Sequence, residues 1–337
     1  MIKRILYTLL IMFPVLASAQ INTDRVMAIG RNALYFEDYV LSIQYFNQVI
    51  NAKPYLSDPY FYRGLAKINL DDFQGAESDC SEAIERNPFV VSAYQVRGLA
   101  RIQQNNFAGA IEDYTKALEF DPENIGVWHN MALCRIRQED YKGAKNDLDK
   151  LIAISPRYTK AYLMRGEVDL KQKDTLAAEK DFGKAIEIDR YDADTWASRA
   201  ILRLQQQRYK DAEADFDHAI RLSTRNSGVY INRALARYHQ NNLRGAMSDY
   251  DIALDIDPNN FIGHYNRGLL RAQVGDDNRA IQDFNFVIEM EPDNMMAIFN
   301  RGLLLDQTGD YKGAIKDYST VINEYPNFLL GYQYRAQ

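Results

Sequence analysis

The chain has 337 residues, a formal net charge of −6, 47% hydrophobic residues and 26% charged residues, a composition typical of a folded globular protein rather than a disordered one. A mean hydropathy of −0.41 excludes a polytopic membrane protein, and two cysteines exclude a disulfide-rich scaffold and the common zinc modules. The acidic balance argues against nucleic-acid binding through a broad basic face.

Residues 1–19 have the three-part pattern of a secretory signal peptide. Lys3 and Arg4 precede an apolar run that ends at Leu16, and Ala17 and Ala19 supply the small residues of a cleavage site. The apolar run is shorter than the roughly 20 residues that a permanent membrane-spanning helix needs. We therefore expect signal cleavage, export to the periplasm or cell envelope, and no stable membrane insertion afterwards. An uncleaved signal anchor is the alternative.

The prolines that follow recur with a period of 34 residues. Seven of the remaining eight lie at positions 54, 88, 122, 156, 258, 292 and 326, and Arg190 and Thr224 occupy the two intervening places. A fixed period of this length indicates a repeat array, and 34 residues suit one helical hairpin per repeat. Nine repeats then cover residues 23–328, and a partial tenth covers 329–337. The nine repeats start at residues 23, 57, 91, 125, 159, 193, 227, 261 and 295.

Other positions of the repeat, numbered 1 to 34 from each start, agree with this phase. Position 8 is Gly or Ala in all nine repeats, position 20 is Ala in eight, and positions 4 and 24 are usually aromatic. Apolar residues spaced three and four apart in both halves predict two amphipathic helices per repeat. The small residues allow the two helices to approach closely, and the proline ends the second helix.

At these positions the chain resembles the tetratricopeptide repeat family over residues 23–337. The resemblance implies an all-α fold, a right-handed superhelical solenoid of helix-turn-helix hairpins, whose first helices line a concave face. Arg at position 7, where the family usually has Leu, departs from the pattern. So do Cys80 at position 24 and His264 at position 4, which we interpret as core substitutions.

The arginines at position 7 need partners, because an unpaired buried charge costs several kcal/mol. Position 23 is Asp in repeats two to nine. We predict that each arginine pairs with the position-23 aspartate of the preceding repeat, as structural pairs that fix repeat stacking. The predicted pairs are Asp79 with Arg97, Asp215 with Arg233, and Asp249 with Arg267. An arginine row that recognises an acidic ligand is the alternative.

The predicted binding surface is the polar sector of the first helices at positions 6 and 13. Side-chain amides both donate and accept hydrogen bonds, so a row of them can hold the backbone of an extended peptide. The amides are Asn130, Asn232, Asn266 and Asn300 at position 6, and Asn69, Gln103, Gln205, Gln273 and Gln307 at position 13. The apolar neighbours Ile231, Tyr265, Phe299, Ile262 and Met296 are expected to receive ligand side chains. Asparagine as a merely tolerated helix residue is the alternative.

The sequence has no signature of a catalytic, cofactor-binding or metal site. It contains no Gly-rich phosphate loop, no His-Glu-x-x-His and no Gly-x-Ser-x-Gly. The four histidines fall at different repeat positions, and the carboxylates recur with the repeat, which favours a structural role. We therefore predict no enzymatic activity and no cofactor.

The sequence thus predicts an exported, non-enzymatic scaffold that binds a protein or peptide partner and no nucleic acid. The alternative is the repeat region of a larger protein with an effector or enzymatic domain beyond residue 337. A further hypothesis is self-association through the C-terminal edge, where the tenth repeat is incomplete.

Overall fold

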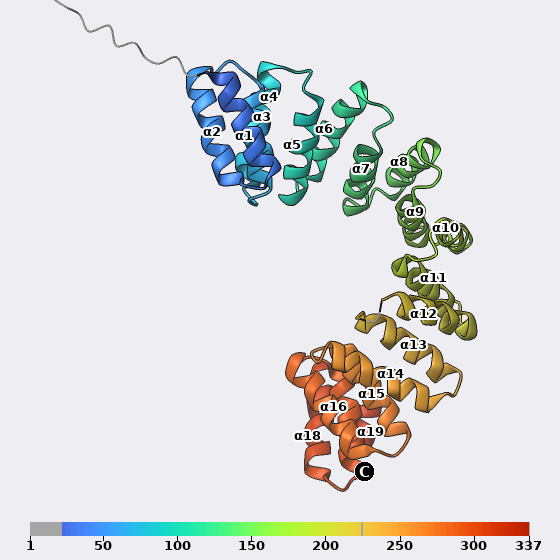
Figure 1. Ribbon diagram of the computed structural model, residues 1–337. Coiled ribbons are helices and arrows are strands. Elements are labelled where there is room, and N and C mark those ends of the chain that lie inside the picture. The colour runs from blue at the N-terminus through green and yellow to red at the C-terminus, as the bar shows by residue number, and fades with distance from the viewer. Residues whose placement is uncertain (1–21, 224, 337) are drawn as a thin grey trace, which may run out of the picture. The chain divides into compact units, whose positions relative to one another are not determined.

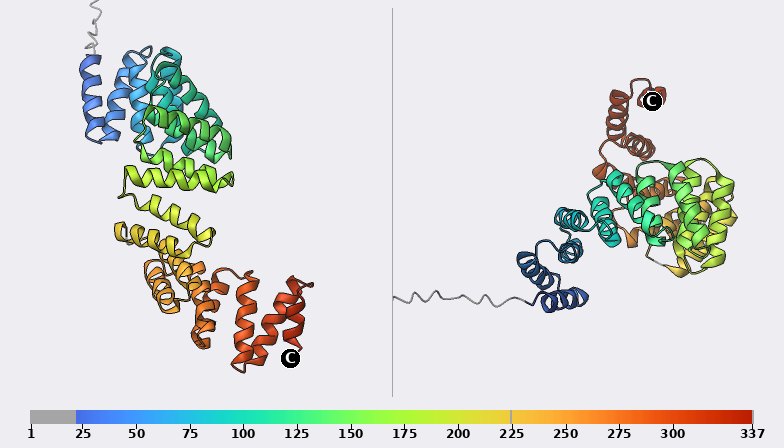
Figure 2. Two further views of the ribbon diagram at one scale, coloured as in Figure 1. Left: turned by 90° about the vertical axis from the view of Figure 1, so that its right-hand side faces the viewer. Right: turned by 90° about the horizontal axis from the view of Figure 1, so that it is seen from above.

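A computed structural model describes residues 22–223 and 225–336 of the chain, so the predicted signal peptide lies outside the described residues. Within these ranges the secondary structure consists of 19 α-helices and no strand, which confirms the expected all-α fold. The helices form consecutive antiparallel pairs (Figures 1 and 2). The chain divides into two compact units, which we call the N-terminal unit, ending at Ile154, and the C-terminal unit, beginning at Ser155.

The N-terminal unit contains four helical hairpins. Its helices are α1 (Thr23–Tyr35), α2 (Tyr39–Ala52), α3 (Asp58–Ile68), α4 (Phe73–Arg86), α5 (Val91–Gln103), α6 (Phe107–Phe120), α7 (Ile125–Arg137) and α8 (Tyr141–Ile154). Each first helix packs against the second helix of its own hairpin, and α2, α4 and α6 also pack against the helix that follows them.

The C-terminal unit continues the same pattern with five hairpins and a final short helix. Its helices are α9 (Thr159–Lys171), α10 (Thr175–Ile188), α11 (Ala193–Gln205), α12 (Tyr209–Leu222), α13 (Ser227–His239), α14 (Leu243–Ile256), α15 (Phe261–Gln273), α16 (Asp277–Met290), α17 (Met295–Gln307), α18 (Tyr311–Glu324) and α19 (Leu329–Arg335). The first helix of nearly every hairpin starts at the residue where the 34-residue phase begins a repeat.

One residue in the turn inside each hairpin adopts the left-handed conformation, in most hairpins the second residue after the first helix. This residue is position 15 of the repeat, with φ between 59° and 64° at seven non-glycine residues and 82° and 90° at Gly275 and Gly309. In most hairpins the side chain at position 16 then caps the second helix: Asp72, for example, accepts a 2.9 Å hydrogen bond from the backbone N–H of Gly75. Such caps satisfy an amide that the helix leaves unpaired at its start.

The core of each hairpin forms where position 8 meets position 24. A methyl group added to Gly98 would lie 2.7 Å from the Tyr114 ring, and one added to Gly166 would lie 2.6 Å from the Phe182 ring. Both rings are fully buried. The small residue therefore allows an aromatic ring to pack directly on the helix backbone, which accounts for the close helix approach that the small residues predict.

Polar atoms of the position-4 side chains hold the turn that precedes their helix. The indole of Trp128 donates to the Pro122 carbonyl at 2.8 Å, and that of Trp196 donates to the Arg190 carbonyl at 3.0 Å. His264 takes the same place: its Nε2 lies 3.0 Å from the Pro258 carbonyl oxygen, and its ring stacks on Phe286 with centroids 4.0 Å apart. The imidazole of His264 therefore makes the same contact with the preceding turn as the tryptophans at position 4, and it stacks on an aromatic ring.

Candidate functional site

The arginines at position 7 pair within their own hairpin. Nη2 of Arg97 lies 2.6 Å from Oδ1 of Asp113, and Nη2 of Arg233 lies 2.6 Å from Oδ1 of Asp249. Seven pairs follow this rule: Arg63–Asp79, Arg97–Asp113, Arg165–Asp181, Arg199–Asp215, Arg233–Asp249, Arg267–Asp283 and Arg301–Asp317. Each joins the first helix to the second helix of one hairpin.

The predicted partners of these arginines are therefore wrong. Asp79 binds Arg63 rather than Arg97, Asp215 binds Arg199 rather than Arg233, and Asp249 binds Arg233 rather than Arg267. Positions 7 and 23 lie at the same level of two antiparallel helices, so the nearest carboxylate is the one in the same hairpin. The guanidinium groups are largely buried and do not form an open row for an acidic ligand.

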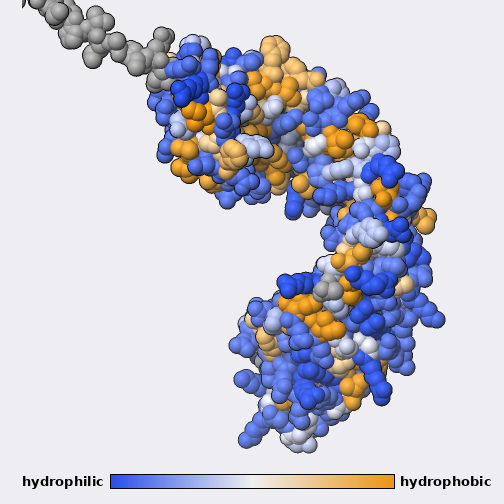
Figure 3. Space-filling model, in the orientation of Figure 1, coloured by the Kyte–Doolittle hydropathy of each residue, from blue (hydrophilic) through white to orange (hydrophobic). Residues whose placement is uncertain are grey.

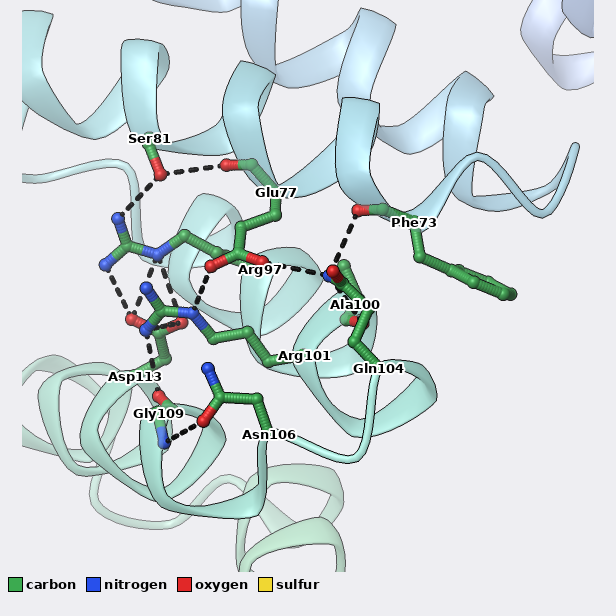
Figure 4. Close-up of polar contacts among 10 residues, drawn as sticks. All are labelled: Phe73, Glu77, Ser81, Arg97, Ala100, Arg101, Gln104, Asn106, Gly109 and Asp113. Atoms are coloured by element: carbon green, nitrogen blue, oxygen red, sulfur yellow. Dashed lines mark hydrogen bonds and ion pairs between the residues drawn. The ribbon is translucent and has the colours of Figure 1, made fainter.

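Neighbouring hairpins are bridged by other carboxylates and hydroxyls. Arg97 also donates to Oγ of Ser81 at 3.1 Å, and Arg101 donates to Oε1 of Glu77 at 2.8 Å (Figure 4). Gln104 donates to Oε2 of the same glutamate at 2.9 Å. These contacts join α5 to the preceding α4, so positions 21 and 25 supply the partners between repeats.

The same network recurs in the C-terminal unit. Arg233 binds Asp217 at 2.7 Å, while Arg237 and Gln240 both bind Glu213 at 2.7 Å. This joins α13 to α12 as Figure 4 shows for α5 and α4. The recurrence at matching repeat positions indicates a structural role in stacking, carried by positions 21 and 25 and not by the position-23 aspartates for which the sequence predicts it.

The fourth hairpin lacks this arginine at position 7, because Met131 stands there. Met131 packs in an apolar cluster with Tyr94, Tyr114 and the half-buried Ile111. Asp147 then has a single guanidinium partner, Arg135, at 2.7 Å. Burial raises the pKa of Asp147 to about 6, and Arg135 only partly opposes this.

The pKa values of two other buried aspartates show how burial and charged partners oppose each other. Burial is the largest influence on both Asp113 and Asp283, and it favours the neutral acid in each case. The pKa of Asp113 is raised despite two arginines. The pKa of Asp283 is lowered, because burial is outweighed by His264, whose Nδ1 lies 3.0 Å from Oδ1, together with Arg267 and Arg271.

The predicted amide positions divide into two groups. At position 13, Asn69, Gln103, Gln205, Gln273 and Gln307 are exposed, whereas at position 6, Asn130, Asn232, Asn266 and Asn300 are half-buried. Asn69 donates to the Leu65 carbonyl of its own helix, and Asn300 donates to the Tyr265 hydroxyl at 3.1 Å. These two amides are partly used within the protein.

Two of the predicted apolar contact residues belong to the core. Ile231 is 7% exposed and packs in a cluster with Tyr230 and Tyr250, and Phe299 is 8% exposed and packs against Phe328. The prediction that Ile231 and Phe299 face a ligand is therefore wrong. The side chain at position 5 of a first helix points toward the next hairpin. The size of the side chains on that hairpin therefore determines how much of the position-5 side chain is exposed to solvent.

A pocket of about 260 Å³ opens on the first helices α15 and α17 of the C-terminal unit. Phe261, Ile262 and Tyr265 line it from α15, and Asn294 and Met296 line it from the start of α17. Ile262 is 51% exposed and Met296 is 58% exposed. Three of the residues that the sequence singled out, Ile262, Tyr265 and Met296, thus meet in one place.

Phe261 and Asn294 are pocket residues that the sequence reasoning missed. A signal was present, because positions 1 and 2 are apolar in the eighth and ninth repeats, as Phe261-Ile262 and Met295-Met296. In the first seven repeats position 2 is a polar residue or glycine. Several hydrophobic areas of this unit are visible among polar surface in Figure 3.

The two cysteines of the chain are buried. Cys80 and Cys134 are free thiols in the core, and burial raises the pKa of Cys80 to about 12 and that of Cys134 to about 11. Cys80 is fully buried, as expected for a core substitution.

Within the described ranges no cluster of histidine, cysteine and acidic residues is arranged to hold a metal ion, and no helix is long and apolar enough to cross a membrane.

The paired helices, the 34-residue phase and the small-against-aromatic core define a helical-hairpin repeat protein. Models of the tetratricopeptide repeat match residues 125–158, 159–192, 198–261 and 265–327, and a related model described as TPR repeat matches residues 98–134. The chain is a tetratricopeptide repeat protein.

Solved structures agree with this fold. A tetratricopeptide repeat protein from Parabacteroides merdae is 21% identical with a TM-score of 0.57, and the alignment covers 74% of this chain and 98% of that one. PilF from Pseudomonas aeruginosa is 18% identical with a TM-score of 0.57, covering 63% and 96%. YrrB, described as having an unusual peptide-binding site, is 18% identical with a TM-score of 0.51, covering 56% and 98%. No curated protein sequence matches the chain.

Proposed function

We propose that this protein is a non-enzymatic scaffold that binds an extended segment of another protein on the first helices of its hairpins, with α15 and α17 as the main contact site. The observation that carries the proposal is the open apolar pocket between exposed Ile262 and Met296. Apolar pockets with a few polar groups are the usual form of a recognition site. The described peptide-binding site of YrrB, a protein of the same fold, supports the same class of function.

The exposed amides of position 13 extend this site along the first helices. Gln273 and Gln307 are exposed on α15 and α17. Their amides can donate to and accept from a peptide backbone without selecting its sequence. We infer that the pocket supplies selectivity and that the amides supply general affinity.

The experiment is to select binders from a random peptide library displayed on phage and to measure one labelled peptide against purified variants. Ile262→Ala and Met296→Ala should each weaken binding at least fivefold, because they remove apolar surface from the pocket. Leu176→Ala is the matched control, because Leu176 is 81% exposed on α10 of the same unit. Equal affinities for all variants would contradict the proposed site.

We propose in addition that the protein acts in the cell envelope, on the basis of the signal-peptide pattern of residues 1–19. Fractionation of expressing cells and the intact mass of the exported chain test this. A cytoplasmic protein that retains Met1 would contradict it.

Self-association through α19 stays a prediction. This helix exposes Leu329 and Leu330. Light scattering that shows only a monomer at high protein concentration would exclude it.

A further inference from the structure

We propose that the pocket on α15 and α17 recognises one large apolar side chain that is flanked in its peptide by lysine or arginine residues. This inference rests on the proposed peptide-binding function and adds the chemical class of the partner. Three features of the site favour such a partner: the size of the pocket, a hydrogen-bond donor at its wall and the charges of the turns beside it.

The size of the pocket suits a single side chain. Its volume of about 260 Å³ lies just below the roughly 300–1,000 Å³ of pockets that take drug-sized ligands. Phe261, Ile262 and Met296 form apolar walls, and the flexible methionine can adapt to the shape of the group that enters. A phenylalanine, leucine or methionine side chain therefore fits, with the peptide backbone outside the pocket.

Tyr265 offers a hydrogen bond to that backbone. Its hydroxyl oxygen accepts the 3.1 Å hydrogen bond from Nδ2 of Asn300, which leaves the hydroxyl proton available to an outside acceptor. Burial raises the pKa of Tyr265, so the group stays protonated at neutral pH. A peptide carbonyl next to the inserted side chain is the natural acceptor.

The turns beside the pocket are acidic. The turn that leads into α15 contains Asp257, the turn that leads into α17 contains Glu291 and Asp293, and neither turn contains lysine or arginine. Asp293 is exposed, and the carboxylates of Asp257 and Glu291 accept hydrogen bonds from neutral asparagine amides rather than from a cationic side chain. Like-signed charge around an opening attracts ligands of the opposite sign.

Nearby positive groups do not cancel this charge. Arg267 and Arg271 on α15 are bound to Asp283, and Arg267 also binds Asp251. The first turns of α15 and α17 carry partial positive charge, but the asparagine caps already occupy backbone donors there. Asn260 accepts from the N–H of Gly263, and Asn294 accepts from that of Ala297, both at 3.0 Å. Each cap thus occupies one of the backbone donors that would otherwise bind an anion.

The test uses three fluorescein-labelled heptapeptides and the purified protein. They are Gly-Lys-Lys-Phe-Lys-Lys-Gly, the same peptide with alanine for phenylalanine, and the phenylalanine peptide with glutamate for every lysine. We expect the first to bind at least tenfold more tightly than the alanine peptide and at least fivefold more tightly than the glutamate peptide at low salt. The second ratio should shrink as salt is added.

Matched variants assign the charge effect to the turns. The double variant Glu291→Gln/Asp293→Asn should bind the phenylalanine-lysine peptide at least threefold more weakly. The control Glu324→Gln, which removes an exposed carboxylate of α18, should leave its affinity unchanged. Met296→Ala should reduce the preference for phenylalanine over alanine. The circular dichroism melting curve of each variant shows whether it is folded.

Several outcomes would overturn the inference. They are equal or tighter binding of the glutamate peptide, equal binding of the alanine peptide, or no binding of any of the three. A dimer that Met296→Ala dissociates in light scattering would make a second copy of the chain the occupant instead. If the phage selection yields peptides that need Ile262 and Met296 but carry no basic flanks, the proposed function stands and this inference falls.

Discussion

Arg97 and Asp113 lie 16 residues apart, on the two helices of one hairpin, and their side chains form a bidentate ion pair. Nε of Arg97 donates to Oδ2 at 3.0 Å and Nη2 donates to Oδ1 at 2.6 Å. Asp113 is only 2% exposed, and Arg101 adds a third donor at 3.0 Å. A single buried carboxylate thus neutralises much of the charge of two arginines.

We predict that Asp113→Ala lowers the free energy of unfolding by about 3 kcal/mol, because it leaves the partly buried Arg97 without a carboxylate partner and Arg101 with Glu77 alone. Urea unfolding followed by circular dichroism measures this. Lys116→Ala is the control on the same helix, since it removes an exposed ion pair with Glu119 and should leave unfolding unchanged. Similar losses in both variants would argue against a special role for the buried pair.

Asp147 should make stability fall as the pH rises from about 4 to about 6. Its pKa is about 6 in the folded chain and about 3.9 in an unfolded chain. Between these values the folded state holds a proton that the unfolded state has lost, so the free energy of unfolding decreases by up to about 1.4 kcal/mol per pH unit. Asp147→Asn should remove this component, as urea unfolding at pH 4.5 and 7 would show.

A reciprocal variant tests the cause of the raised pKa. Met131→Arg places a guanidinium where seven other hairpins have one. We expect it to lower the pKa of Asp147, which ¹³C NMR of the side-chain carboxyl measures directly. An unchanged pKa would mean that burial alone, rather than the missing partner, controls this group.

Gly98→Ala should destabilise the protein by about 1–3 kcal/mol, because the added methyl group would lie 2.7 Å from the Tyr114 ring and force the helices apart. Gly183→Ala is the matched control. Gly183 lies within α10, and its added methyl group meets no atom within 4 Å. This change should stabilise by about 0.5–1 kcal/mol through helix propensity. Thermal melting compares the two, and equal effects would contradict the packing argument.

Gly275→Ala should cost about 1 kcal/mol, because Gly275 has φ +82°, a conformation that side chains disfavour. The cost is conformational, since no atom lies within 4 Å of the added methyl group. Gly126→Ala in the first turn of α7, where the methyl group makes an ordinary 3.5 Å contact, is the comparison. Melting temperatures that drop equally would show that the turn conformation is not the cause.

The repeat and its helices can be derived from the sequence. The strict 34-residue period, with small residues at position 8 and aromatic residues at position 24, predicts a stack of helical hairpins. In such a stack the apolar face of each helix is covered by its neighbours. The close approach of the two helices that the small residues predict is seen at Gly98, which the ring of Tyr114 contacts directly. Likewise, Ile262 and Met296 already stood out in the sequence as apolar residues near the start of two successive first helices.

The side-chain partners across the helices could not be derived from the sequence and required the three-dimensional packing. The repeat places an aspartate both in the same hairpin and in the preceding one, and periodicity cannot distinguish two partners that recur with the same period. The antiparallel register made Asp113, rather than Asp79, the partner of Arg97. The same limit applies to position 5: Tyr265 borders an open pocket while Phe299 is buried, because the neighbouring side chains, not the repeat phase, fill or leave the space.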